Sequence, residues 1–378
     1  MRMPLRARQW PTRRAMLALG LLAACGTPTG SSSPSVPALR LEGADISALE
    51  RIEQAGGVFR DSGRTEDAIA ILRAHGANTF RLRLFVNPND SDVQVNDLPY
   101  TLRMAARIKA SGAKLLLDFH YSDTWADPGH QTTPAAWAGL TFDSLTRQVE
   151  AYTAAVITQL KGAGALPDIV QVGNEIDGGI LWPLGQVGGS SDTVRQWTQF
   201  TGLLKAGIRG VRDALAPGDT VRIMLQYSQG GSTGGTQWFL DHIRAYGVPY
   251  DLLGLSYYPW WHGTLAQLQA NLRATALRYG VDIVVVETSY PWRAGGWEGI
   301  ATNTAPMTWP VTREGQTQFL RDVVAAVAAT PGSHGAGVLW WYPEAIPVTG
   351  VFIWGGGSLA LFDSTGNVLP ASATFRAN

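Results

Sequence analysis

The sequence has very little cysteine and no excess of charge of either sign. Its 378 residues include one Cys, so no disulfide can form within the chain. The 30 basic side chains equal the 30 acidic ones, which removes the electrostatic reason to expect nucleic acid or an acidic membrane surface as a partner. No G-x-G-x-x-G pattern follows the first predicted strand, which weakens a nucleotide-binding interpretation.

The apolar run near the N-terminus, residues 15–24, is too short to cross a bilayer. It follows a basic stretch, and this order is typical of an export signal. LAAC at 22–25 resembles a bacterial lipobox, in which the cysteine is lipidated and becomes the new N-terminus. We therefore expect a signal peptide over 1–25, a flexible linker over 26–38, and membrane contact only through lipid on Cys25. The alternative for Cys25 is an ordinary small residue near a cleavage site.

The chain contains 14 Trp and 11 Tyr, more Trp than core packing usually needs. Flat apolar rings stack on sugar rings, and they also fill aromatic cores. The composition therefore favours a carbohydrate ligand without excluding a Trp-rich core.

Short apolar runs alternate with amphipathic segments from residue 41 onward. Eight of these runs are predicted strands: 43–46, 79–85, 114–119, 169–173, 221–226, 252–256, 283–286 and 337–341. Predicted helices are at 65–74, 98–111, 144–160, 194–214, 265–279 and 316–329. This alternation favours an α/β fold in which the strands close into a (β/α)8 TIM barrel, rather than an open doubly wound sheet. No second linker is found, so residues 39–378 are expected to form a single domain.

Polar side chains follow the predicted strands at the ends where such barrels carry their active sites. The fourth strand ends in Asn174-Glu175 and the seventh in Glu287. Burying an unpaired ionised group is costly, so each glutamate needs a partner or a chemical role, and an ion-paired strand cap is the alternative for either one alone. Two carboxyl groups across a cleft can cleave a glycosidic bond, one as proton donor and the other ionised. A separation of about 5–5.5 Å would give retention of configuration, and about 6.5–9.5 Å inversion.

These two strand ends resemble clan A of the glycoside hydrolases, which are retaining barrels. Within the clan, the chain resembles family 53, the endo-β-1,4-galactanases, over about 43–369. The similar segments are GADIS at 43–47, FRLRLFVNP at 80–88, LLLDFHYSDTWADPGHQ at 115–131, VQVGNEIDGGILWP at 170–183, LSYYPWW at 255–261, VVVETSYPW at 284–292 and WPVTREGQ at 309–316. The resemblance implies endo-hydrolysis of the β-1,4-galactan in pectic arabinogalactan, without a cofactor. We also expect a monomer.

The resemblance implies roles for single residues. Glu175 would be the general acid/base and Glu287 the nucleophile. Arg81 would hold Glu287 ionised, and Asn174 would hydrogen-bond the sugar 2-hydroxyl. The expected substrate-binding residues are Arg81, Arg83, Asp118, His120, Asn174, Tyr257, Tyr258, Trp292, Trp340 and Trp341.

At two places, two adjacent residues are alternatives for one role. Either Tyr257 or Tyr258 would line the catalytic subsite. Either Trp340 or Trp341 would stack under the sugar.

A metal site is another interpretation, because ligand-like spacing is found at Asp118, His120, Asp123, Asp127 and His130. No His-x-His pair ends the first strand and no strand-borne Lys completes the set, so we expect a hydrogen-bonded, substrate-facing loop instead. Some bacterial family members have an acidic calcium loop after the seventh strand. RAGGWE at 293–298 has no cluster of hard oxygen ligands, so we expect no structural calcium.

Two rival functions remain. Another clan A β-glycanase, of mannanase or xylanase type, would differ in how the pocket treats the axial 4-hydroxyl of galactose, which spacing does not reveal. A non-catalytic glycan-binding surface lipoprotein would have no need for two buried glutamates together with Arg81 and Asn174.

Overall fold

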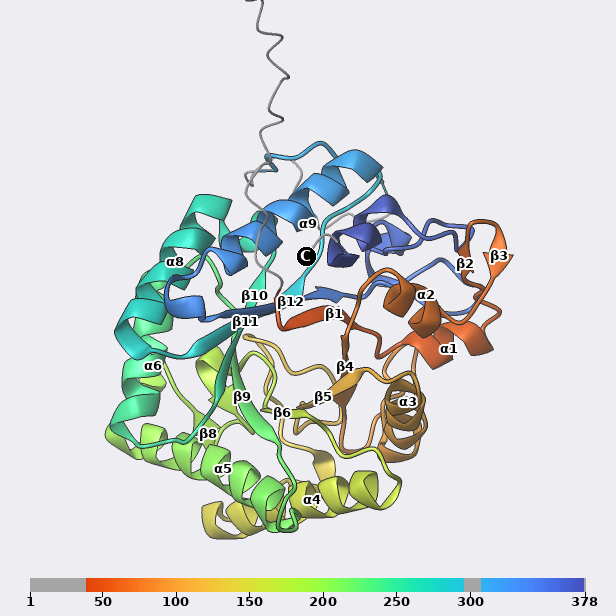
Figure 1. Ribbon diagram of the computed structural model, residues 1–378. Helices are drawn as coiled ribbons and strands as arrows, with labels where there is room; N and C mark the ends of the chain where they lie inside the picture. The colour runs from red at the N-terminus through yellow and green to blue at the C-terminus, as the bar shows by residue number, and fades with distance from the viewer. Residues whose placement is uncertain (1–38, 296–306, 377–378) are drawn as a thin grey trace, which may run out of the picture. The chain divides into compact units, whose positions relative to one another are not determined.

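The computed structural model describes residues 39–295 and 307–376. Eight parallel strands form a closed barrel in the order β1-β12-β11-β10-β9-β6-β5-β4. They are β1 (Leu41–Asp45), β4 (Thr79–Leu84), β5 (Lys114–Phe119), β6 (Ile169–Val172), β9 (Arg222–Tyr227), β10 (Leu252–Tyr257), β11 (Asp282–Thr288) and β12 (Gly335–Trp341). Figure 1 shows these strands at the centre of the molecule with helices around them. The predicted barrel is confirmed.

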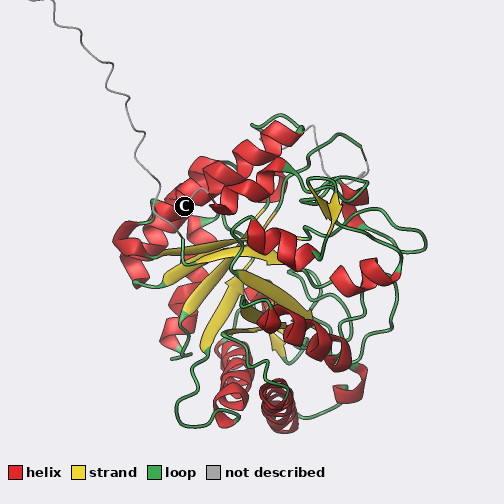
Figure 2. Ribbon diagram, turned by 45° about the vertical axis from the view of Figure 1, so that its right-hand side comes forward, coloured by secondary structure: helices red, strands yellow, loops and turns green. Residues whose placement is uncertain are grey.

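Helices cover the outside of the barrel, as Figure 2 also shows. They are α1 (Leu49–Gln54), α2 (Ala68–Ala74), α3 (Leu98–Ala110), α4 (Phe142–Gly162), α5 (Val194–Asp213), α6 (Thr233–Ala245), α7 (Pro259–His262), α8 (Leu265–Tyr279) and α9 (Arg313–Ala328). Two small antiparallel pairs complete the described strands: β2 (Arg60–Asp61) with β3 (Arg64–Thr65), and β7 (Gly179–Ile180) with β8 (Gly185–Gln186).

Side-chain caps set where most of the longer helices begin. Asp67 accepts a hydrogen bond from the Ala70 N–H, so α2 begins after it and not at the predicted residue 65. Ser232 caps α6, a helix that is not among those predicted from the sequence. The first turn of α6 contains two glycines, which lower helix propensity by about 1 kcal/mol each and hide the helical pattern.

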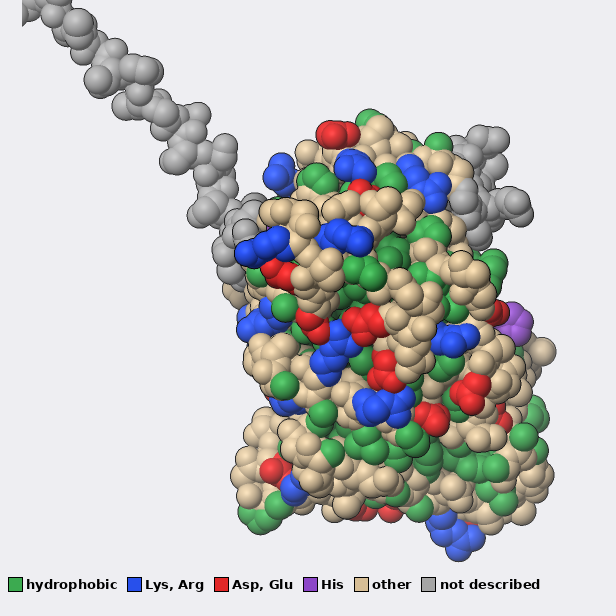
Figure 3. All heavy atoms as spheres, turned by 90° about the vertical axis from the view of Figure 1, so that its right-hand side faces the viewer, with side chains coloured by type: hydrophobic (Ala, Val, Ile, Leu, Met, Phe, Trp, Pro, Cys, Tyr) green, Lys and Arg blue, Asp and Glu red, His purple; other side chains and the backbone are tan. Residues whose placement is uncertain are grey.

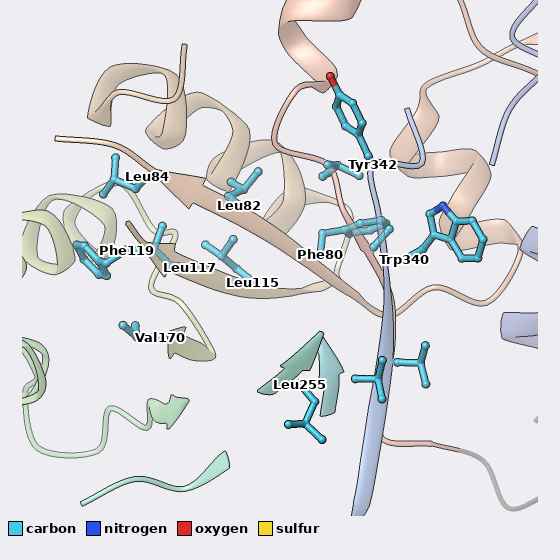
Figure 4. Packing of buried hydrophobic residues seen from close by; sticks show 14 of the residues in the cluster. Phe80, Leu82, Leu84, Leu115, Leu117, Phe119, Val170, Leu255, Trp340 and Tyr342 are labelled. Carbon is cyan, nitrogen blue, oxygen red and sulfur yellow. The ribbon is translucent and has the colours of Figure 1, made fainter. Parts of the chain in front are cut away.

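The barrel has two apolar cores. The larger lies between strands and helices, and Figure 4 shows part of it around β4 and β5. The smaller fills a layer inside the barrel and consists of Leu41, Leu116, Ile169, Met224, Leu252, Val284, Val286, Ala336 and Leu339. Side chains alternate along a strand, so Arg81 and Arg83 point to the interior while Phe80, Leu82 and Leu84 face the helices. Polar side chains therefore occupy the interior beyond the apolar layer, toward the carboxyl ends of the strands.

Figure 3 shows the face formed by α1, α2 and α3, where acidic and basic side chains are interspersed. Ion pairs on these helices include Arg103 with Glu50 at 2.7 Å and Arg107 with Glu53 at 2.6 Å. This mixture agrees with the zero net charge of the chain. In the described part of the chain, no helix has the length and apolar character needed to cross a membrane.

Candidate active site

A cleft of about 450 Å³ lies where the carboxyl ends of the barrel strands meet the following loops. Its lining combines charged groups with aromatic rings. The lining residues are Asp45, Arg81, Arg83, Asp92, Val93, Gln94, His120, Trp125, Ala126, Asp127, Asn174, Glu175, Tyr258, Trp261, Glu287, Trp341, Phe352 and Trp354. Both glutamates singled out in the sequence are among them.

Glu175 follows β6 on a turn with an uncommon backbone conformation. Its φ is +44°, in the left-handed region that costs a non-glycine residue about 1–2 kcal/mol. The side-chain amide of Gln131 donates to the carbonyl oxygens of Asn174 at 2.8 Å and Glu175 at 3.2 Å. The Glu175 N–H donates to Oε1 of Gln226 at 3.1 Å. These three bonds hold the turn in the conformation that presents Glu175 to the cleft.

The carboxyl group of Glu175 has an increased affinity for its proton. Burial raises the pKa of Glu175 well above its ordinary value, and the charge of Glu287 raises it further. The Ser256 hydroxyl donates to Oε1 of Glu175 at 2.7 Å, which acts in the opposite direction. A carboxyl group with a raised pKa can keep its proton near neutral pH and donate it to a leaving group.

Glu287 reaches the interior through an irregularity in β11. Leu255 of β10 pairs with Val285, whereas the next residue, Ser256, pairs with Glu287. The extra residue on β11 is a β-bulge, and bulges of this kind redirect side chains beside active sites. As a result, both Val286 and Glu287 face the interior. Strict alternation would have turned Glu287 toward the helices.

One ion pair and two hydrogen bonds hold the Glu287 carboxylate. Nη1 of Arg81 lies 2.9 Å from Oε1, and Nε2 of Gln226 donates to the same oxygen at 3.0 Å. The hydroxyl of Tyr258 donates to Oε2 at 3.1 Å. Burial raises the pKa of Tyr258 well above its ordinary value, and Glu287 adds to the shift, so the phenol keeps the proton that it donates. These charge-assisted bonds fix the orientation of the carboxylate.

Arg81 lies at the centre of this polar interior. Its Nη1 contacts Oδ2 of Asp45 at 2.8 Å, and its Nη2 contacts Oδ2 of Asp118 at 2.8 Å and Oδ1 of Asn174 at 2.7 Å. Burial opposes the charge on Arg81, but the carboxylates of Asp118, Glu287 and Asp45 raise its pKa above the ordinary value. The guanidinium therefore joins side chains from the ends of β1, β5, β6 and β11.

His120 and Arg83 are also held at the cleft. The N–H of Ala126 donates to Nδ1 of His120 at 3.0 Å, so the ring proton lies on Nε2, which is 3.1 Å from Oδ2 of Asp118. Nη2 of Arg83 donates to a backbone carbonyl at 2.9 Å, and its guanidinium lies 4.3 Å from the ring centroid of Trp125. Both side chains thus have fixed orientations beside the glutamates.

Aromatic rings extend from the glutamates to the rim of the cleft. The centroid of Trp341 lies 6.3 Å from that of Tyr258 and 5.2 Å from that of Trp354, and Trp354 lies 5.9 Å from Trp261. At the rim, Trp261 is 53% exposed and Phe352 is 64% exposed. Exposed rings beside a polar cleft are suited to stack on sugar rings.

Tyr257 and Trp340 lie outside the cleft, so they leave the predicted set of substrate-contacting residues. Tyr257 faces the helices and its hydroxyl donates to a backbone carbonyl at 3.1 Å. Trp340 belongs to the outer core, where Figure 4 shows it, and its Nε1 donates to a backbone carbonyl at 2.9 Å. Because side chains alternate along a strand, their neighbours Tyr258 and Trp341 line the cleft instead.

Asp118 and Trp292 also do not line the cleft. Asp118 is fully buried behind Arg81 and also accepts a hydrogen bond from Nε2 of Gln171 at 2.6 Å. Trp292 donates from Nε1 to a backbone carbonyl at 2.9 Å, and the Arg313 guanidinium lies 5.3 Å from its ring. Asp118 therefore orients Arg81 from the side away from the cleft, whereas Trp292 packs against Arg313.

The residues proposed as alternative metal ligands are occupied by other partners. Asp118 and His120 bond to each other, Asp123 accepts from two backbone N–H groups, and Asp127 pairs with His130 at 2.9 Å. Among the described residues, no group of three or more His, Cys, Asp or Glu side chains is arranged to hold a metal ion. The calcium expectation concerned 293–298, of which 296–298 lie outside the described residues.

Several residues that build the site were not predicted from the sequence, namely Gln131, Gln226, Ser256, Trp261 and Trp354. Gln226 and Ser256 had a usable signal, because each places a polar side chain in an otherwise apolar strand. A buried polar group needs hydrogen-bond partners, and such a group near a strand end indicates a polar site.

The fold agrees with comparisons to known proteins. The model of glycosyl hydrolase family 53 matches residues 41–375. The chain belongs to this family.

Curated relatives and solved structures of family 53 cover most of the chain. A probable arabinogalactan endo-β-1,4-galactanase A of Aspergillus terreus is 38% identical over 81% of this chain and 86% of that protein. The endo-β-1,4-galactanase of Bacillus subtilis is 35% identical over 82% of this chain and 71% of that protein. The family 53 catalytic domain of Ignisphaera aggregans superposes with a TM-score of 0.84 and 33% identity, covering 91% of this chain and 97% of that one. A family 10 enzyme of Paenibacillus barcinonensis, at 17% identity and a TM-score of 0.55, shares the fold alone.

Proposed function

We propose that this protein hydrolyses β-1,4-galactosidic bonds within galactan by a retaining double displacement. Glu175 is the general acid/base and Glu287 is the nucleophile. The proposal rests on one observation above all: a carboxyl group with a raised pKa lines the same cleft as a carboxylate that is fixed by one ion pair and two hydrogen bonds.

In the first step, the glycosidic oxygen takes the proton of Glu175 while the bond to the anomeric carbon breaks. Glu287 forms the new bond to that carbon, giving a glycosyl-enzyme intermediate. In the second step, Glu175 removes a proton from water, which attacks the anomeric carbon and releases Glu287. Two inversions at one carbon give overall retention.

The other cleft residues serve binding. The amide of Asn174 donates one hydrogen to the Ala126 carbonyl at 2.7 Å, which leaves its second hydrogen for a sugar hydroxyl. Arg83 and His120 line the cleft, where Nε and Nη1 of Arg83 have no hydrogen-bond partner among the described residues. Trp341, Trp261 and Trp354 supply stacking surfaces. The names of the relatives support galactan as the polysaccharide, in preference to mannan, xylan or a binding role without catalysis.

The test compares reducing-sugar release from linear galactan, mannan and xylan. We expect release from galactan, with β-configured product seen by NMR early in the reaction. Glu287→Ala should lose turnover and still bind galacto-oligosaccharides, whereas Glu314→Ala, which changes an exposed acid at the start of α9, serves as the control. Activity confined to mannan or xylan rejects the substrate, an α-configured product rejects retention, and hydrolysis by Glu287→Ala at the parent rate rejects the nucleophile.

We also propose that the protein is exported and anchored at the cell envelope through lipid on Cys25. Residues 1–38 lie outside the described residues, so this proposal rests on the sequence pattern at 15–25. Mass spectrometry of the membrane fraction should find a lipid-modified N-terminal Cys25. Unmodified protein with cleavage at another residue would contradict the anchor while leaving export intact.

A further inference from the structure

The side-chain amide of Gln226 has only one orientation that satisfies its surroundings. Its Oε1 accepts from Nε2 of Gln171 at 2.6 Å, the backbone N–H of Glu175 at 3.1 Å and Nη2 of Arg81 at 3.3 Å. Turning the amide over would place its NH2 group against these three donors. The partners therefore fix which atom is oxygen and which is nitrogen.

With the amide fixed, the direction of the next hydrogen bonds follows. Nε2 of Gln226 donates to Oε1 of Glu287 at 3.0 Å and to Oγ of Ser256 at 3.1 Å, which uses both of its hydrogens. Ser256 is fully buried, so its hydroxyl has no access to solvent. Its single proton must then go to the remaining neighbour, Oε1 of Glu175, at 2.7 Å. The hydrogen bonds run in one direction from Gln226 through Ser256 to Glu175.

The two oxygens of Glu175 are thereby unequal. Oε1 accepts from Ser256, whereas Oε2 has no hydrogen-bond partner among the described residues. In a protonated carboxyl group, the carbonyl oxygen accepts hydrogen bonds and the hydroxyl oxygen donates. An oxygen that already accepts a hydrogen bond from a fixed donor is the less favourable site for the carboxyl proton.

We propose that Ser256, held by Gln226, is a positioning residue that keeps Oε1 of Glu175 as the acceptor and so places the transferable proton on Oε2. This inference rests on the proposed function of Glu175. In the first step, the Oε2–H bond breaks as the glycosidic oxygen takes the proton, and the electrons of that O–H bond stay on Oε2. In the second step, Oε2 takes a proton from the attacking water. Oε1 keeps the Ser256 hydrogen bond throughout.

The arrangement also sets the proton affinity of Glu175. A hydroxyl that donates to a carboxyl group favours the ionised form, so Ser256 lowers the pKa that burial raises. Loss of this donor should therefore raise the pKa of Glu175. It should also leave both oxygens as sites for the proton, only one of which faces the leaving group.

The experiment compares Ser256→Ala with Ser289→Ala. Ser289 is also fully buried, and its hydroxyl has no hydrogen-bond partner in the described part of the chain, so it matches the loss of a buried hydroxyl without the loss of this bond. The substrates are linear galactan, whose leaving group needs a proton, and 2,4-dinitrophenyl β-1,4-galactobioside, whose leaving group does not. The rate constant compared is kcat/KM, which reports the first step.

For Ser256→Ala we expect kcat/KM on galactan to fall about tenfold, with less than about a twofold change on the dinitrophenyl substrate. The alkaline limb of its galactan pH profile should move up by about one pH unit. Ser289→Ala should match the parent in both respects. Ser256→Thr keeps the hydroxyl and should restore the position of the limb, even if its added methyl lowers the rate.

An unmoved alkaline limb in Ser256→Ala, or an equal loss on both substrates, overturns the inference and makes Ser256 a packing residue. If Ser256→Ala is too slow to assay, ¹³C NMR of labelled glutamate gives the pKa of Glu175 without substrate, and an unchanged value overturns the inference equally. A parent protein inactive on galactan overturns the proposed function instead, which separates the two failures.

Discussion

Arg81 and Glu287 form an ion pair, 2.9 Å from Nη1 to Oε1, that crosses the interior of the barrel. Their strands, β4 and β11, are not neighbours, because β1 and β12 lie between them in the closed sheet. Only closure of the barrel brings the two side chains together. The same guanidinium meets Asp45 and Asp118, so three carboxylates share one buried cation.

Arg81→Met should destabilise the protein strongly, because it leaves these carboxylates buried without their cation. Removal of one partner of a buried ion pair typically costs about 3–5 kcal/mol in the free energy of unfolding. Urea unfolding followed by circular dichroism measures the change. Arg103→Met removes a surface ion pair with Glu50 and should cost about 1 kcal/mol or less. Equal losses in the two variants would show that the interior network does not stabilise the fold.

Glu175→Gln should lower kcat/KM on linear galactan by about 10²–10⁴, because an amide cannot donate the proton that the leaving group needs. On 2,4-dinitrophenyl β-1,4-galactobioside the loss should be far smaller. The thermal unfolding midpoint serves as the control and should not fall, because glutamine keeps the size of the side chain. A loss of the same size on both substrates would contradict the acid role.

Glu344→Gln should make stability less dependent on pH. Glu344 is fully buried, its Oε1 accepts from the Ala48 N–H at 2.8 Å, and burial, with the charge of Asp45, raises its pKa to about 8. The fold therefore favours the protonated form. The stability that the protonated form of Glu344 contributes is fully present below pH 4.5, the ordinary pKa of the group. It is lost as pH rises through the raised pKa of about 8.

Glutamine mimics the protonated carboxyl group and removes this loss. The unfolding free energy of the variant minus that of the parent should increase by on the order of a few kcal/mol from pH 5 to pH 9. Chemical denaturation at the two pH values measures the gain. A difference between variant and parent that is the same at both pH values would contradict the raised pKa.

Trp261→Ala should raise KM for galactan with little effect on stability, because the ring is 53% exposed at the rim of the cleft. Loss of a stacked aromatic contact should weaken binding by about 0.5–1.5 kcal/mol, or about two- to tenfold in KM. Leu277→Ala is the control, since Leu277 is 65% exposed on α8 and does not line the cleft. An unchanged KM would place the sugar chain elsewhere along the cleft.

The sequence allowed the barrel to be predicted because apolar strands alternate with helices at regular spacing. It also placed Asn174 and Glu175 at a strand end. The family resemblance placed Glu287 at the site, but strand alternation alone does not predict its inward direction, because that direction depends on a bulge that forms only when β10 and β11 pair. Alternation along β4 places Arg83 on the same side as Arg81, whereas the choice between Trp340 and Trp341 needed the register of β12.

The pairwise contacts across the barrel could not be predicted from the sequence either. The sequence around a glutamine in a strand does not indicate its hydrogen-bond partners. Gln226 has five such partners, which lie on different strands and loops. The aromatic residues of the last loop, Phe352 and Trp354, lie in a segment without regular periodicity. The contact of Trp354 with Trp261, and the place of Phe352 in the lining of the cleft, follow from the tertiary fold.

The fixed amide of Gln226 has a consequence for how quickly the enzyme can work. Its partners are all parts of the chain itself, so the charges and dipoles around both glutamates are in place before any sugar arrives. Reorganisation of the surroundings, which slows charge separation in water, is completed once per molecule at folding and is not repeated at each turnover.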